Sequence, residues 1–311
     1  MNPNTRLNLL LLSTVFLSGT IIFSAWPLVF KENSRATVSA SVFCANLSPQ
    51  LSLTGKAAYA QDLDTGEVLY EKNADIQLPL ASLTKLMTAL VASDVLEDDD
   101  TVTISKDALT PEGDSGFTLG ERWRVKNLID FTLVTSSNDG AHALALATEK
   151  KKHGSSEMFI QYMNQKAVSL GMSQTFFADD TGLDISENSA GAFGSARDIG
   201  KLFAHIVETK PRLVEGTTVV RDTFLSLDNT KHRGTNTSSV ISLLPGAIGS
   251  KTGFTDIAGG NLAITFEPLP GHGVVAVILG STREGRDADM VALTNALKTS
   301  MRRSLICNTN Q

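Results

Sequence analysis

Three short sequence patterns carry side chains that could perform acyl transfer. In the first, Ser82-Leu83-Thr84-Lys85, a hydroxyl and an amine stand three positions apart at the start of a predicted helix, and this spacing puts both on one helix face. A serine hydroxyl becomes a nucleophile when a base removes its proton, and a lysine can be that base when burial and nearby cations lower its pKa. The pattern is therefore typical of a nucleophile, Ser82, and its base, Lys85.

The second pattern, Ser136-Ser137-Asn138, lies in a polar gap between two stretches with helical periodicity. Ser136 could relay protons, and Asn138 could orient the lysine or a substrate amide. Ser, Asn and Asp are also the residues that cap helix N-termini, so this segment could serve the helix expected to begin at Asp139. Both interpretations are compatible with the sequence.

The third pattern, Lys251-Thr252-Gly253, falls inside an apolar run ahead of Phe254. A lysine is out of place in such a strand unless it faces a site. Lys251 and Thr252 can hold a carboxylate, and a glycine lets a ligand approach the strand backbone closely. Because a chain of this length contains Lys-Thr-Gly by chance in only about one case in ten, this pattern is the most specific of the three.

A sheet and several helices must position these residues. Short or alternating apolar runs predict strands over 57–62, 67–70, 248–254, 261–266 and 274–279, with a turn at 64–66. Helical spacing predicts helices from residue 83, over 125–133, 139–148, 158–170 and 196–207, and from 287 to 303. Strands at both ends with helices between them predict an α+β fold in which the terminal strands meet in one antiparallel sheet.

Composition narrows the class of protein. A formal net charge of −6 without a basic cluster argues against a nucleic-acid partner. The two cysteines, Cys44 and Cys307, have no zinc-ligand spacing, and the five histidines form no metal-binding pattern. Asp179, Asp180 and Asp184 lack the ligand alternation of a calcium loop and predict a polar turn. We therefore expect no metal.

The first segment points to a membrane. Residues 7–30 carry no charge and are flanked by Arg6 and Lys31, and roughly 20 such residues span a bilayer as a helix. The stretch is longer than the apolar part of a usual secretory signal, which favours an uncleaved anchor, although Val38-Ser39-Ala40 loosely resembles a cleavage site. We expect a protein outside the cytoplasmic membrane, anchored by this segment, or periplasmic or secreted if the segment is cleaved.

In this order and at these intervals, the three patterns resemble the active-site serine penicillin-recognising enzymes, and more closely the low-molecular-mass D-alanyl-D-alanine carboxypeptidases. Residues 119–122, 177–184 and 195–198 are also similar to that family. The resemblance covers about 56–303 and implies a β-lactamase/transpeptidase-like fold. The chain is then expected to contain a signal or membrane anchor, a tether, a penicillin-binding catalytic domain and a tail, over 1–35, 36–55, 56–305 and 306–311.

The resemblance implies a serine-type D-Ala-D-Ala carboxypeptidase that trims peptidoglycan stem peptides and needs no cofactor. Ser82 would be acylated by the peptide or by a β-lactam, with Lys85 as general base and Ser136 and Asn138 around the bound peptide. The backbone N–H groups of Ser82 and Phe254 would form the oxyanion hole. The remaining residues implied to contact the substrate are Lys251, Thr252, Gly253 and Arg286.

The chain departs from the family at several places. The family usually has a glycine or alanine at Ser137 and an alanine at Gly140, and often Asn-Pro where Asp179-Asp180 stand. Many members continue into a β-rich domain and a C-terminal amphipathic anchor, so the N-terminal segment is expected to replace that anchor.

Three other functions are alternatives to the carboxypeptidase activity. A D-Ala-D-Ala endopeptidase acting on cross-links needs the same residues. A class A β-lactamase uses a further glutamate after the second motif, but Glu149 and Glu157 lack the expected Glu-x-x-x-Asn setting. A non-catalytic peptidoglycan-binding protein would have lost a motif residue, and none is lost.

Overall fold

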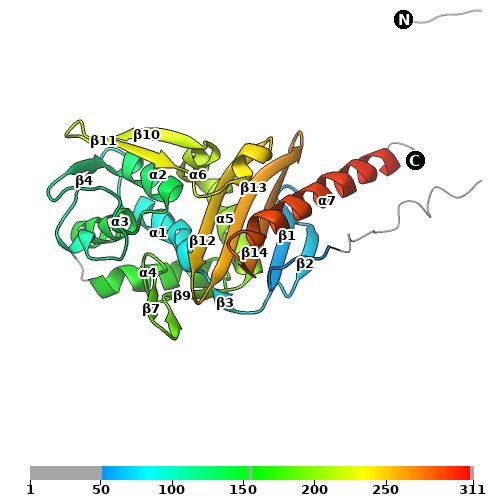
Figure 1. The fold of residues 1–311 in the computed structure, drawn as a ribbon, viewed down its shortest axis with the longest axis horizontal. Coiled ribbons are helices and arrows are strands. Elements are labelled where there is room, and N and C mark those ends of the chain that lie inside the picture. The colour runs from blue at the N-terminus through cyan, green and yellow to red at the C-terminus, as the bar shows by residue number, and fades with distance from the viewer. Residues whose placement is uncertain (1–50, 154–155, 309–311) are drawn as a thin grey trace, which may run out of the picture. The chain divides into compact units, whose positions relative to one another are not determined.

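A computed structural model describes residues 51–153 and 156–308. Strands from the two ends of this part meet in one antiparallel sheet of five strands, in the order β12-β13-β14-β1-β2 (Figure 1). The strands are β1 (Ala57–Asp62), β2 (Val68–Lys72), β12 (Ala247–Thr255), β13 (Gly259–Leu269) and β14 (His272–Ser281). The predicted α+β fold, with its terminal strands in one sheet, is confirmed.

Both faces of this sheet are covered by helices, α5 (Ala196–Thr209) on one face and α7 (Gly285–Asn308) on the other (Figure 1). Side chains alternate between the faces of a strand. Tyr59 and Val277 therefore join the core on the α5 side, while Ala58 and Ile278 join Met290 and other buried residues of α7. This explains why the inner strands are apolar almost without interruption.

The helices between the terminal strands lie beside β12 and carry two of the three motifs (Figure 1). At the centre is α1, whose residues Thr84 to Ala92 are all buried. A helix that is buried on every side needs no polar face, so α1 shows no amphipathic stripe. The elements are the 3₁₀ turn η2 (Ala81–Leu83), α1 (Thr84–Ser93), α2 (Val125–Thr135), α3 (Asn138–Lys151) and α4 (Ser156–Ser169). The predicted helices are confirmed, with small differences at their ends.

Several short elements were not predicted. Most have two or three residues per strand, which is too short for periodicity to show. The hairpin of β10 (Arg221–Leu225) and β11 (Lys231–Thr235) is longer, but Phe224 is the one buried residue of β10, so it lacks an apolar pattern. The short strand pairings are β3 (Leu78–Pro79), β9 (Ala192–Gly194) and β6 (Phe176–Phe177); β4 (Thr101–Thr103) with β5 (Arg122–Arg124); and β7 (Asp184–Ser186) with β8 (Ser189–Ala190). Short helical turns are η3 (Asp107–Leu109), α6 (Arg212–Glu215), η4 (Gly216–Thr218) and η5 (Val240–Leu243).

The chain is packed against the sheet before the predicted domain start at residue 56. Leu53 is buried, and the backbone N–H groups of Thr54 and Gly55 each donate to the Asp289 carboxylate of α7 at 2.8 Å. The segment 7–30, the tether up to residue 50 and Cys44 lie outside the described residues, as does the side chain of Cys307. Within the described ranges, no helix combines the length and the apolar character needed to cross a bilayer.

Candidate active site

Ser82 and Lys85 face each other where η2 passes into α1. The Lys85 Nζ donates to the Ser82 Oγ at 2.9 Å. Ser82 is half-buried while Lys85 is fully buried, so a ligand can reach the hydroxyl and water is kept from the amine. Ala81 has φ +49, a left-handed conformation that strains the turn presenting Ser82.

The surroundings of Lys85 adjust its basicity. Its Nζ also donates to the Asn138 Oδ1 and to the Thr181 carbonyl, both at 2.7 Å. Burial lowers the pKa of Lys85 to about 7, although the nearby Asp179 and Asp180 act to raise it. Near neutral pH a substantial fraction of this lysine is therefore an uncharged amine that can accept a proton.

The second and third motifs meet through Lys251. Its Nζ donates to the Ser136 Oγ and to the Thr252 carbonyl, both at 2.8 Å. Ser136 ends α2 in a left-handed conformation, with φ +62. Burial, followed by the charges of Lys85 and Arg286, holds the pKa of Lys251 well below its usual value. The three predicted motifs thus come together at one place.

Gly253 allows β12 to approach the serine turn. A Cβ at this position would lie 2.8 Å from the Leu80 carbonyl oxygen and 3.3 Å from the Leu83 backbone nitrogen. Any side chain would push β12 away from η2. The glycine thus admits the neighbouring backbone, and its predicted contact with a ligand stays a prediction.

Two hydroxyl groups face each other beside β12. The Oγ1 atoms of Thr252 and Thr237 lie 2.6 Å apart. Thr237 was not predicted, because it lies in a polar loop without a motif. Next to them, the guanidinium of Arg283 lies over the ring of Phe254, with its Cζ 4.0 Å from the ring centroid.

Arg286 lies behind β12. Its Nη1 donates to the Gly253 carbonyl at 2.8 Å, its Nε contacts Asp287 at 3.3 Å, and only 7% of the residue is exposed. We interpret this arginine as a support for the strand, and its predicted contact with a substrate carboxylate stays a prediction.

Ser137 and Asn138 divide the two roles considered for the second motif. The Ser137 Oγ accepts from the Gly140 N–H at 2.9 Å and so caps α3, while Asn138 reaches Lys85. The Asn138 Nδ2 also donates to the Glu112 carbonyl at 2.6 Å, and the hydroxyls of Ser137 and Ser115 are 2.6 Å apart. The loop around 112–115 is therefore fastened to α3 beside the site.

The polar turn predicted at residues 179–184 lies behind the serine. The Asp179 Oδ1 accepts from the N–H groups of Thr181 at 2.7 Å and of Gly182 at 2.6 Å. Gly182 has φ +80, and a Cβ there would be 2.0 Å from the Ala81 carbonyl oxygen. Only glycine fits this approach of the turn to η2.

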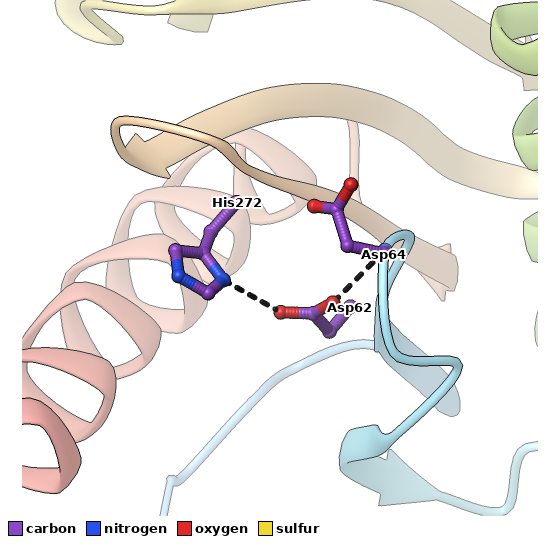
Figure 2. A group of neighbouring side chains, drawn as sticks. All are labelled: Asp62, Asp64 and His272. Carbon is purple, nitrogen blue, oxygen red and sulfur yellow. Dashed lines mark hydrogen bonds and ion pairs between the residues drawn. The ribbon is translucent and has the colours of Figure 1, made fainter. Parts of the chain in front are cut away.

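One group of metal-ligand side chains occurs in the described part of the chain, far from Ser82 along the sheet. Asp62, Asp64 and His272 place their ligand atoms within 4.8 Å of one another, and Figure 2 shows His272 facing Asp62. The Asp62 Oδ1 accepts from the N–H groups of Asp64 and Thr65 at 3.0 and 2.8 Å, and the Asp64 Oδ2 accepts from Gly273 at 2.9 Å. These contacts fasten the β1–β2 turn to the start of β14, so both carboxylates have a structural role at this turn.

The sheet, the helices beside it and the Ser–Lys pair define the class of penicillin-recognising serine enzymes. A family model described as D-alanyl-D-alanine carboxypeptidase matches residues 44–282. The chain belongs to this family of serine peptidases, which confirms the predicted resemblance, fold and enzyme class.

Individual relatives agree with this assignment. The D-alanyl-D-alanine carboxypeptidase DacF of Bacillus subtilis is 29% identical over 291 residues, which cover 91% of this chain and 69% of DacF. A D-alanyl-D-alanine endopeptidase of Escherichia coli is 32% identical over 235 residues, or 71% of this chain and 69% of the relative. Penicillin-binding protein D2 of Listeria monocytogenes, solved with cefotaxime bound, superposes with a TM-score of 0.69 at 29% identity and covers 81% of this chain and 99% of that protein.

Proposed function

We propose that this protein removes the terminal D-alanine from peptidoglycan stem peptides through an acyl-enzyme on Ser82. The observation that carries the proposal is the 2.9 Å hydrogen bond between Lys85 Nζ and Ser82 Oγ, formed by a lysine whose pKa is about 7. Such a lysine can take the serine proton at neutral pH and give it back later in the reaction. Membership of the carboxypeptidase family supports the class of substrate.

The reaction needs water as its one further reactant. The Ser82 Oγ attacks the carbonyl carbon of the penultimate D-alanine while its proton moves to Lys85. The C–N bond then breaks, and the amine of the terminal D-alanine leaves with that proton. Water adds to the ester and gives one proton to Lys85 as it attacks. This proton returns to Ser82 as the shortened peptide departs as a carboxylic acid, which then loses its proton to the solvent.

The strand β12 is suited to the rest of the substrate. The close approach of Gly253 to η2 brings the backbone of Phe254 near the serine turn, where its N–H and that of Ser82 would stabilise the oxyanion. Lys251 and the hydroxyls of Thr252 and Thr237 offer hydrogen-bond donors to the terminal carboxylate, whose negative charge would favour a proton on Lys251.

We propose that β-lactams acylate Ser82 too. Penicillin-binding protein D2 has been solved with cefotaxime and with ampicillin bound, and a β-lactam presents a reactive carbonyl and a carboxylate as the peptide does. We further propose that residues 1–35 anchor the protein at the outer face of the cytoplasmic membrane, which membrane fractionation and N-terminal sequencing of the mature chain would test.

The test is to incubate the full chain in detergent with a fluorescent penicillin and to map the label by mass spectrometry, beside the variant Ser82→Ala. We expect a stable adduct on Ser82 in the natural chain and none in the variant. Rapid consumption of the penicillin without an adduct would favour a β-lactamase instead. Neither adduct nor consumption would contradict the proposal.

Cleavage of D-alanyl cross-links is a second candidate function. Two relatives at 31% and 32% identity are D-alanyl-D-alanine endopeptidases, and their chemistry needs the same residues. Purified monomeric pentapeptide and cross-linked dimers separate the two functions. Release of free D-alanine from the monomer supports the carboxypeptidase, whereas conversion of dimers to monomers, absent in Ser82→Ala, supports the endopeptidase.

A further inference from the structure

Helices α1 and α3 are joined by two neighbouring sets of contacts. In the first, Lys85 of α1 donates to Asn138 of α3 at 2.7 Å. In the second, one turn further along each helix, the Thr88 Oγ1 donates to the Asp180 carbonyl at 2.6 Å, and the Asp180 Oδ2 lies 2.8 Å from the His142 Nδ1. Asp180 therefore links the helix of Lys85 to the helix of Asn138 directly behind the reacting pair.

His142 is the hydrogen-bond partner of the buried Asp180 carboxylate. Asp180 is only 7% exposed, and its other oxygen, Oδ1, is buried and has no hydrogen-bond partner among the described residues. A buried carboxylate is stable as an anion only beside a matching charge or donor. The contact therefore favours a protonated imidazolium at His142.

We propose that His142 and Asp180 are positioning residues that hold Lys85 against Ser82 and set the pH above which Lys85 accepts the serine proton. The inference rests on the proposed function, because it concerns the base of that reaction. Neither residue belongs to the three motifs.

The charges around His142 and Asp180 determine in which direction the pKa of Lys85 changes. The carboxylates of Asp179 and Asp180 act to raise the pKa of Lys85 against the effect of burial. The hydrogen bond that His142 donates to the Asp180 carboxylate raises the pKa of His142, and burial opposes this. The negative charges of Asp180, Asp179 and Glu149 raise that pKa further. Asp139, on the same helix, also interacts with His142.

A proton on His142 thus acts on Lys85 through Asp180. An imidazolium neutralises Asp180, so Lys85 gives up its own proton at a lower pH. Asp179 is less suited to this role, because one oxygen of its carboxylate is held by backbone N–H groups of its own turn.

The experiment measures the second-order rate of Ser82 acylation by a fluorescent penicillin against pH, with the full chain in detergent. The rate rises with pH as Lys85 loses its proton. Asp180→Asn removes a negative charge, so this rise should move to lower pH, whereas His142→Gln removes the neutralising charge and should move it to higher pH. We expect displacements of about one pH unit.

The control is His272→Gln, the same substitution at a histidine that lies 3.5 Å from Asp62 at the other end of the sheet. It should leave the pH profile unchanged. The glutamine of His142→Gln keeps a donor for Asp180, so this variant carries the test if Asp180→Asn does not fold, which thermal melting would reveal.

Acylation profiles that do not move, or that move in the same direction in both variants, would overturn the inference. A loss of rate at every pH with an unmoved profile would indicate a merely structural role and would also overturn it. A natural chain that is not acylated at any pH would count against the proposed function instead, so the two failures can be told apart.

Discussion

The two buried lysines of the site differ in the charges that face them. Lys85 has Asp179 and Asp180 nearby, and its pKa is about 7. Burial and the positive charges of Lys85 and Arg286 together hold the pKa of Lys251 well below its usual value. Burial alone would treat both side chains alike. The carboxylates behind Lys85 thus oppose the effect of burial on its pKa, whereas the cations beside Lys251 add to that effect.

The largest expected effect comes from removing the first lysine. Lys85→Ala should lower the acylation rate by about 100-fold to 10,000-fold, the usual contribution of a general base. In the natural chain the rate should fall as the pH drops below about 7, because protonated Lys85 cannot accept the serine proton. Stopped-flow labelling against pH measures both effects. A variant that keeps its rate and its pH profile would contradict the role of Lys85.

The second lysine, Lys251, should matter most for substrates with a free terminal carboxylate. Lys251→Ala should slow the reaction of a peptide with a free terminal carboxylate by about tenfold to a hundredfold, because a charge-assisted hydrogen bond is lost. A peptide whose terminus is an amide should lose much less. The ratio of kcat/KM for the two peptides is the measurement, and an equal loss for both would show that Lys251 does not bind the carboxylate.

The smallest effect concerns the strand that carries Lys251. Gly253→Ala places a methyl group 2.8 Å from the Leu80 carbonyl oxygen, so we expect a loss of about 1–3 kcal/mol in the free energy of unfolding and slower acylation as β12 moves from Ser82. Gly216→Ala is the matched control, since its nearest neighbour is the flexible carboxylate of Asp130 at 3.3 Å. Chemical denaturation and labelling of both variants test this, and equal behaviour would remove the steric explanation.

Local patterns predicted much of the fold. Strand β1 was predicted with the ends that the structure shows, and α2, α3 and α5 were predicted because their apolar residues recur at helical spacing. The hairpin of β10 and β11 was missed, because its stability depends on Phe224 and His232 packing against aromatic residues of other elements, and not on a pattern of its own.

The sequence alone is enough to predict that Ser82 pairs with Lys85, because residues three positions apart lie on one face of a helical turn. It also determined that the terminal strands would meet. The contacts of Lys251 with Ser136 and of His142 with Asp180 depend on the whole fold, because they join residues 115 and 38 positions apart. Such contacts, and the pKa values that depend on them, arise from burial and from charges brought close by folding, and no local spacing records them.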